Sequence, residues 1–175
     1  MEALIHFVVP FAALVLMGVR VVEAAPIALL GVLPDLDILF HVHRSPTHSL
    51  VLITLAAAPF IAVLWLTGSR NFPHSLRGYL CAATHPVLDV FGGYTPVLWP
   101  LYGKSLWVES SVLVEYGSRM RMELSLELHR TPTRFPRRPV LTGALLTGEA
   151  LMISLILVSA ALYGLYTRRT GKGQQ

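Results

Sequence analysis

The stretch Pro34-Asp35-Leu36-Asp37 stands between two apolar segments, residues 24–33 and 49–68, and decides where the chain turns. It carries two of the three aspartates of the 175-residue chain, and the third lies in His85-Pro86-Val87-Leu88-Asp89. Five of the seven histidines lie in or close to these two motifs. Aspartate normally scatters over loops, turns and helix starts. Its confinement beside histidine therefore predicts a chemical role, and metal binding is the chemistry that both residue types serve.

The composition indicates a membrane protein. Hydrophobic residues make up 54% of the chain and charged residues 14%, whereas a soluble domain carries roughly 25% charged residues. The mean hydropathy is +0.60. Because a spanning helix needs about 20 apolar residues, we expect an all-α integral protein of the cell (inner or plasma) membrane. Four to five transmembrane helices are expected from the apolar segments 3–19, 24–33, 49–68, 76–91 and 140–166.

The first apolar segment also allows a cleaved signal peptide, because Val22-Glu23-Ala24-Ala25 resembles a processing site. The residues before the apolar core, however, include Glu2 and no Lys or Arg, which is the opposite of what such a signal needs. We therefore expect His6 to remain part of the protein.

The net charge of +4 and the pI near 9.6 could suggest a nucleic-acid partner. Most arginines, however, flank the apolar segments, where membrane topology and lipid headgroups explain them. We expect the lipid bilayer, and no nucleic acid, as the partner, and the oligomeric state stays open. Cys81 is the single cysteine, so an intramolecular disulfide is excluded.

Residues 93–138 are expected to form an extramembrane insertion within a single domain, residues 1–175. Apolar residues alternate with polar ones from Met120 to Leu128, which is the period of a β-strand. Gly117-Ser118 is a suitable hairpin turn. A two-residue turn would nevertheless place Val112 and Val114 opposite Glu123 and Arg121, which mixes the faces unless a bulge intervenes. The sequence thus predicts a small β-hairpin and leaves its register open.

Successive spanning helices deliver their ends to alternate membrane faces, and this rule tests the metal hypothesis. From His6 the chain crosses to Arg20 and returns to the Asp35 and Asp37 pair. Two further crossings bring the motif of residues 85–89 to the same face and leave His74 on the other. The residues expected to converge as metal ligands are His6, Asp35, Asp37, His43, His48, His85 and Asp89.

The residue types also indicate which metal to expect. His85 and Asp89 are four residues apart, so their Cβ atoms lie about 5–6 Å apart on one helix face. An aspartate inside a spanning helix costs roughly 2.5–3.5 kcal/mol, so it needs a partner or a function. Histidine and carboxylate ligands without cysteine suit zinc, manganese or iron, and zinc is the favoured choice. Several acidic ligands suit two ions about 3.5–4 Å apart.

Three further residues are candidates for catalysis. Asp37 or Glu149 could act as the general base. Arg44 could neutralise a substrate phosphate, or it could be a positive charge that only helps to set the membrane topology. Glu149 is expected ten residues inside the last span, about 15 Å deep. There it would either close the floor of the site or make an interhelical hydrogen bond. Roles outside the site are expected for three residues: Ser49 as a helix N-cap, His41 in a loop and His129 at the surface.

Three motifs in this order resemble the family of LexA-binding, inner-membrane-bound metal-dependent hydrolases, over about residues 1–100. They are Gly31-Val32-Leu33-Pro34-Asp35-Leu36-Asp37, His43-Arg44-Ser45-Pro46-Thr47-His48-Ser49, and His85-Pro86-Val87-Leu88-Asp89 followed by Trp99-Pro100-Leu101. This chain departs from the family pattern at Ser45 and Ile5, where the family has Gly and Thr. The family name implies a LexA partner that no residue of this chain supports.

The motifs are more distantly similar to zinc-dependent phospholipase C and the S1-type nucleases. That likeness implies a first metal at Asp35, His48, His85 and Asp89, and a second at His6 and a shared Asp89. It also implies phosphodiester or phospholipid hydrolysis.

The sequence therefore predicts a membrane-bound metal-dependent hydrolase, with a lipid or another phosphoester as substrate. One alternative is a metal or proton transporter, although transporters place their sites near the midplane with polar residues toward both faces. The other is a non-catalytic scaffold with a coordinatively closed metal site.

Overall fold

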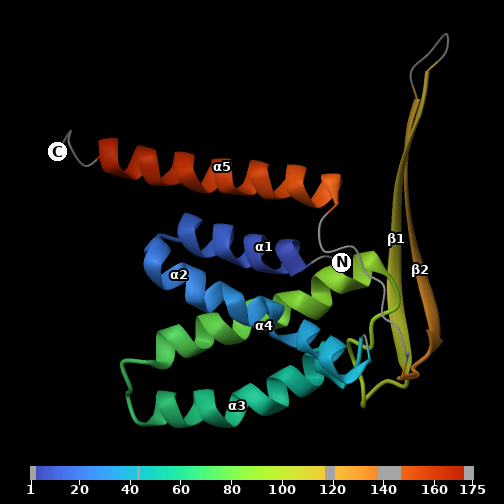
Figure 1. The fold of residues 1–175 in the computed structure, drawn as a ribbon, viewed down its shortest axis with the longest axis horizontal. Helices are drawn as coiled ribbons and strands as arrows, with labels where there is room; N and C mark the ends of the chain where they lie inside the picture. Colours follow the sequence, from blue (N-terminus) through green and yellow to red (C-terminus); the bar gives the residue numbers. More distant parts are fainter. Residues whose placement is uncertain (1–2, 43, 117–120, 138–146, 172–175) are drawn as a thin grey trace.

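A computed structural model describes residues 3–42, 44–116, 121–137 and 147–171. The long helices run back and forth nearly parallel to one another, and a two-stranded hairpin crosses one end of the bundle (Figure 1). The elements in chain order are α1 (Ala3–Leu16), α2 (Val21–Ala28), the 3-10 helices η1 (Leu29–Phe40) and η2 (Pro46–His48), α3 (Leu50–Leu66), α4 (Phe72–Gly92), β1 (Lys104–Glu115), β2 (Arg121–Pro132) and α5 (Gly148–Gly171). The expectation of a mostly helical protein with a small hairpin is confirmed.

Among the described residues, one helix meets the criteria for a transmembrane span by itself, and not the expected four to five. Within the described residues, only Gly148–Arg168 is both long and apolar enough to cross a membrane. The apolar helices α1 and α3 have 14 and 17 residues, fewer than the roughly 20 that a span requires. Helix α4 has 21 residues, but polar groups such as Arg77 and Asp89 interrupt its apolar pattern.

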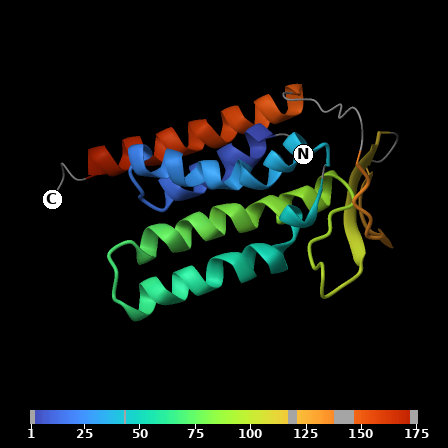
Figure 2. The same cartoon turned by 60° about the horizontal axis from the view of Figure 1, so that its bottom comes forward.

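Small residues pack α1 against α5 and α2, and Figure 2 shows α4 lying between these helices and α3. Ala12 and Ala161 are almost fully buried where α1 meets α5, and Ala24 and Ala28 are fully buried on α2. Short side chains allow helix axes to approach closely without a hydrophobic driving force from water. The core therefore lies around α1, and α3 contributes no buried residue.

The second apolar segment contains two different helices. Helix α2 ends at Ala28, and the chain continues for 12 residues as η1. A 3-10 helix of this length is uncommon, because its hydrogen bonds have poorer geometry. Pro34 lies inside η1 and lacks an N–H group. With three residues per turn, Asp35 and Asp37 point in different directions from the same helix.

Local polar contacts join α3 to its neighbours. Ser49 caps α3, since its side chain accepts a hydrogen bond from the Leu52 N–H at 3.3 Å, which confirms the expected role. The Thr54 and Tyr79 hydroxyls lie 2.9 Å apart and connect α3 to α4. The first turns of α3 are therefore tied to the first half of α4.

The hairpin resolves the register that the sequence left open. Val112 pairs with Leu124, and Val114 pairs with Met122. The pairing closes at residues 115 and 121, and the expected turn at Gly117-Ser118 lies outside the described residues. The observed register places the apolar side chains on one face without a bulge.

Candidate metal centre

Five titratable side chains meet where α4 ends, at the hairpin end of the bundle. Three histidines are 0% exposed, Asp89 is 1% exposed, and the side chain of Asp35 is 20% exposed. They form two groups whose possible ligand atoms lie within 4.8 Å of one another. The groups are His6, Asp35 and His85, and His48, His85 and Asp89. Because the groups share His85, the cluster offers ligands for one ion or for two adjacent ions.

The orientation of His85 is fixed by a hydrogen bond through Nδ1. This nitrogen lies 2.7 Å from the Gly31 carbonyl oxygen, which can only accept, so Nδ1 carries the hydrogen. The Nε2 atom makes no hydrogen bond with the described residues and is completely buried. It lies 3.5 Å from Asp35 Oδ1 and 4.0 Å from Asp89 Oδ2. The carboxylates repel the lone pair of His85 Nε2 unless a cation lies between them. This geometry therefore fits a metal ligand.

Gly31 allows η1 to approach α1 closely enough to reach His85. A Cβ atom at Gly31 would lie 2.4 Å from the His6 carbonyl oxygen and 3.3 Å from the Cys81 carbonyl oxygen. No side chain tolerates the first of these distances. Gly31 is therefore a packing requirement of the site. The sequence alone assigned it no role.

His6 lies against His85 on the opposite side of the cluster from α3. The two rings stack with centroids 3.7 Å apart, and His6 Nε2 lies 3.3 Å from Asp89 Oδ1. Neither ring nitrogen of His6 makes a hydrogen bond with the described residues. Imidazole nitrogens and a carboxylate oxygen are among the ligands that zinc takes in proteins.

His48 bridges the carboxylates on two sides of its ring. Its Nε2 atom lies 3.5 Å from both Asp35 Oδ1 and Asp89 Oδ2, and its Nδ1 atom lies 3.3 Å from Asp37 Oδ2. Burial by itself lowers the pKa of His48, but the contacts with Asp35 and Asp37 outweigh it and raise the pKa to about 9. A metal ion at Nε2 would take the place of the proton that His48 otherwise holds.

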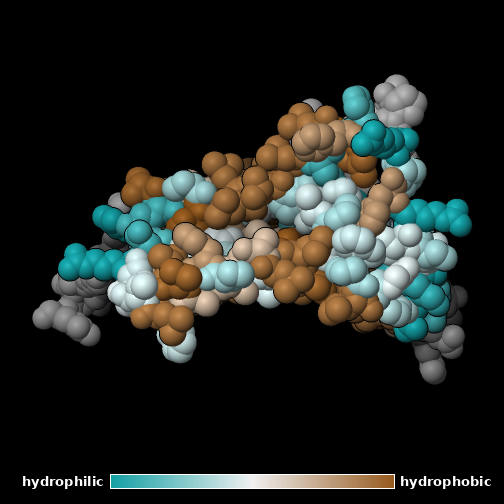
Figure 3. All heavy atoms as spheres, turned by 90° about the horizontal axis from the view of Figure 1, so that it is seen from below, coloured by the Kyte–Doolittle hydropathy of each residue, from teal (hydrophilic) through white to brown (hydrophobic). Residues whose placement is uncertain are grey.

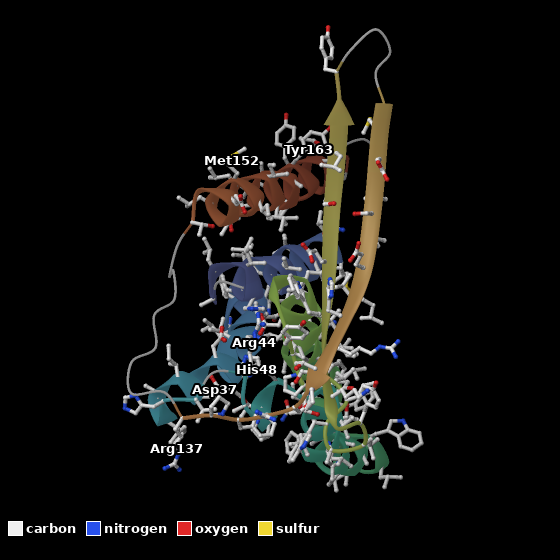
Figure 4. The ribbon with its side chains drawn as sticks, turned by 90° about the vertical axis from the view of Figure 1, so that its right-hand side faces the viewer. Asp37, Arg44, His48, Arg137, Met152 and Tyr163 are labelled. Atoms are coloured by element: carbon white, nitrogen blue, oxygen red, sulfur yellow. The ribbon has the colours of Figure 1, made fainter. Side chains whose placement is uncertain are left out.

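Asp37 lies behind His48 and not within either candidate ligand group. Its side chain is almost fully buried and accepts a hydrogen bond from the Ser45 N–H at 2.8 Å. A carboxylate at the outer nitrogen of a ligating histidine orients the ring and raises its basicity. Figure 4 looks at the bundle from the hairpin side, and there Asp37, Arg44 and His48 lie together, away from Met152 and Tyr163 on α5.

Arg44 ties the loop after η1 to the end of α4. Its Nε atom lies 3.3 Å from Asp89 Oδ2, and its terminal nitrogens donate to the Tyr94 and Asp89 carbonyls at 3.3 and 3.5 Å. A cation is favourable at the C-terminus of a helix, where carbonyls lack partners. Gly93 leaves room for this contact, because a Cβ there would lie 2.4 Å from an Arg44 nitrogen.

Of two further residues expected in the site, one lies elsewhere and the other is outside the described residues. Thr147 caps the start of α5 with a hydroxyl 3.2 Å from the Ala150 nitrogen, so Glu149 lies in the first turn and is exposed. The expected depth of about 15 Å is wrong, because the described helix begins at Gly148 and not at residue 140. His43 lies outside the described residues.

The other histidines lie away from the cluster. His41 ends η1 and is exposed, and His74 is exposed near the opposite end of α4. His129 lies in β2, with Nε2 3.0 Å from Glu109 Oε2.

Thr47 connects His48 to η1. Its hydroxyl lies 3.2 Å from His48 Nδ1 and donates to the Pro34 carbonyl at 3.1 Å.

Comparisons with known proteins give one match. A family model described as YdjM inner membrane protein matches residues 1–170, which is nearly the whole chain. No curated protein and no solved structure matches the chain.

Proposed function

Because the chain belongs to the YdjM inner membrane protein family, we propose that its histidine and aspartate cluster is the metal centre of a membrane-bound hydrolase. The protein is located in the inner membrane, so a substrate can reach the site from the lipid or from the adjoining water. The proposed substrate is a phosphoester, and the proposed cofactor is a pair of divalent transition-metal ions. Zinc is the preferred metal, with manganese as the alternative.

The buried Nε2 atom of His85 is the observation that carries this proposal. A hydrogen bond from Nδ1 to Gly31 leaves the Nε2 lone pair facing Asp35 and Asp89. Structural zinc sites are usually built from cysteine and histidine, whereas mixed histidine and carboxylate ligands are frequent in hydrolytic sites. Asp35 is partly exposed, so one edge of the cluster is open to a water molecule or a substrate.

The proposed reaction is hydrolysis by an activated water. Divalent ions lower the pKa of a bound water to about 7 and polarise the phosphoryl oxygen. The hydroxide formed from that water would bond to phosphorus as the bond to the leaving alkoxide breaks. The proton released by the water would pass to the alkoxide, which would leave as an alcohol. Asp37 keeps His48 in its ligating orientation, and Arg44 supplies positive charge beside Asp89. Glu149 makes no hydrogen bond or ion pair with the described residues, so no step is assigned to it.

We also propose that α1, the α2 and η1 segment, α3, α4 and α5 cross the membrane side by side. Large apolar side chains on α3 and α5 are exposed, including Phe60, Trp65 and Met152. On the face seen in Figure 3, hydrophobic residues occupy the middle and hydrophilic residues gather toward the two ends. This distribution suits helices that shield one another in lipid although several are shorter than a full span.

An apolar core below the cluster favours an enzyme over a transporter. One helical turn from His85 toward the start of α4, Cys81 is buried in a cluster with Val15, Ala24 and Ala28. A transporter needs polar groups toward both membrane faces. Within the described residues, the polar side chains of the bundle interior gather at the hairpin end instead.

Metal analysis and a substrate panel test the proposed function. Wild-type protein, purified in detergent and loaded with zinc or manganese, should retain metal and hydrolyse phosphodiesters or phospholipids. His85→Ala and Asp89→Ala should lose both properties. His74→Ala, at the opposite end of α4, should keep both.

Three outcomes would contradict the proposal in different ways. Equal metal content in all four proteins would contradict the metal centre. Chelator-sensitive cleavage of peptides alone would contradict the substrate class. Bound metal without turnover of any substrate would favour the scaffold alternative.

A further inference from the structure

A groove of about 590 Å³ lies between η1, α3 and α4. Sites for small ligands commonly hold roughly 300 to 1,000 Å³. Apolar side chains dominate its walls, among them Leu30 and Leu33 from η1, Ile53, Ala57 and Phe60 from α3, and Ala82 from α4.

The groove ends beside the metal centre. Pro34 and Thr47 line it, and the same two residues are joined by the hydrogen bond from the Thr47 hydroxyl to the Pro34 carbonyl. Thr47 also contacts Nδ1 of His48 at 3.2 Å. Asp35 follows Pro34 directly. A molecule in the groove therefore has one end next to the candidate ligands.

The length of the groove corresponds to one leaflet of a bilayer. Its lining on α3 extends from Leu52 to Ile61, and the nine steps between these residues, at about 1.5 Å each, correspond to about 14 Å. The hydrocarbon core of a bilayer is about 30 Å thick, so one leaflet measures about 15 Å. Small side chains create the space, since Ala56, Ala57 and Gly78 line the groove.

With α3 crossing the membrane as proposed above, lipid is the apolar material around this part of the protein. Helix α3 is apolar over Leu50–Leu66 except for Thr54, yet it has no buried residue. Phe60 lines the groove and is 60% exposed. Because the protein is located in the inner membrane, an exposed apolar helix is covered by acyl chains.

We propose that the groove binds one acyl chain of a membrane lipid and thereby places the phosphoester of its headgroup at the metal centre. This inference rests on the hydrolase function proposed above and identifies the substrate class as a lipid with a phosphorylated headgroup. The apolar walls recognise the chain, and the histidine and aspartate cluster receives the polar end. Binding of the remote chain thus orients the reacting group.

Two neighbouring alanines on α3 allow a matched test. Ala57 lines this groove, whereas Ala58 lines a neighbouring groove with Trp65 and Phe72. The two grooves share Ile61 and Tyr79, but Pro34 and Thr47, which lie beside the metal centre, line only the first. Ala57→Phe therefore fills the proposed chain site, and Ala58→Phe adds the same side chain one position away. Ala56→Phe fills the proposed site from a second position. Metal content measured on every variant reports whether the centre remains folded.

The probe is a diacyl phospholipid with a diazirine in the middle of one acyl chain, incorporated into nanodiscs with the full-length protein. Cross-links mapped by mass spectrometry should fall on groove residues of η1, α3 and α4. Ala57→Phe and Ala56→Phe should each reduce them roughly tenfold, the change produced by a loss of about 1.4 kcal/mol in binding. Ala58→Phe should retain them.

The outcomes separate this inference from the proposed function. Cross-links outside the groove, or cross-links that Ala57→Phe and Ala56→Phe leave unchanged while metal is retained, would overturn the acyl-chain site. Cross-linking in the groove by a protein that cleaves no phosphoester would support the chain site and overturn the hydrolase. If both hold, Ala57→Phe and Ala56→Phe should raise KM for long-chain lipids, whereas Ala58→Phe should not.

Discussion

At the residue scale, the candidate centre depends on which nitrogen each imidazole turns toward a carboxylate. His85 uses Nδ1 for a backbone carbonyl and turns Nε2 inward, whereas His48 has a carboxylate at each nitrogen. The sequence places these histidines near aspartates but cannot distinguish the two cases. The hydrogen bond to Gly31 joins residues 54 positions apart, so only the packed helices create it.

Metal affinity is expected to rise with pH. The contacts with Asp35 and Asp37 raise the pKa of His48 to about 9 although burial lowers it. Below that pH the metal-free protein holds a proton on His48, and a metal ion must displace it. Each unit of falling pH should therefore weaken binding about tenfold. Competition with a chelator between about pH 6.5 and 8.5 measures this slope, and an affinity independent of pH would contradict the role of His48.

Asp37→Asn is expected to weaken metal binding without abolishing it. Loss of a carboxylate behind a ligating histidine typically costs about 10–100-fold in metal affinity. Glu109→Gln is the matched control, because Glu109 contacts His129 in the hairpin, away from the cluster. Dissociation constants from chelator competition decide the point. A complete loss of metal, as severe as that of Asp89→Ala, would instead make Asp37 a ligand.

At the scale of the elements, close backbone approach decides whether η1 can serve the site. Gly31→Ala should push η1 away from α1, because the new Cβ would lie 2.4 Å from the His6 carbonyl oxygen. Overpacking of this kind costs about 1–3 kcal/mol. We expect a lower thermal midpoint and less bound metal, measured on the purified protein. Gly103→Ala, where a Cβ would meet nothing within 4 Å, should change neither; equal behaviour of the two variants would contradict the prediction.

The docking of α5 on α1 depends on Arg168. Its guanidinium donates to the Val15 carbonyl at 3.3 Å and to the Leu16 carbonyl at the C-terminus of α1. The Val15 carbonyl also accepts from the Gly18 N–H at 3.0 Å. Arg168→Met should destabilise this contact by roughly 1 kcal/mol. Limited proteolysis should then release α5 faster. Arg70→Met, at an exposed position between α3 and α4, is the control. Identical proteolysis of both variants would show that Arg168 contributes nothing measurable.

At the scale of the whole molecule, the end of α4 that carries the candidate metal cluster lies beside the hairpin, and the loop between α3 and α4 lies at the other end of the bundle (Figure 1). If α4 crosses the membrane, Lys104 and Arg70 face opposite compartments. Single cysteines at Lys104 and Arg70, in a Cys81→Ala background, should therefore react with an impermeant maleimide from opposite sides. Labelling of both from one side would contradict the proposed crossing of α4.

The sequence by itself determined the class of the protein and the composition of its centre. Low charge and long apolar segments indicate a membrane location, which the family match supports. The alternation around residues 120–128 predicts the hairpin. The alternating direction of the helices predicts that His6, Asp35 and Asp89 lie at one end. These features follow from local composition and periodicity, which depend little on how the helices pack.

Only the tertiary structure decided the assignments within that centre. It places Asp37 behind His48, engages Arg44 with α4, and leaves Glu149 in the first turn of α5. It also reveals the groove beside Thr47. Each of these depends on contacts between residues far apart in the chain or on where a helix begins. Residue types reveal which ligands are available, but the distances that give each one its role arise only when the helices pack.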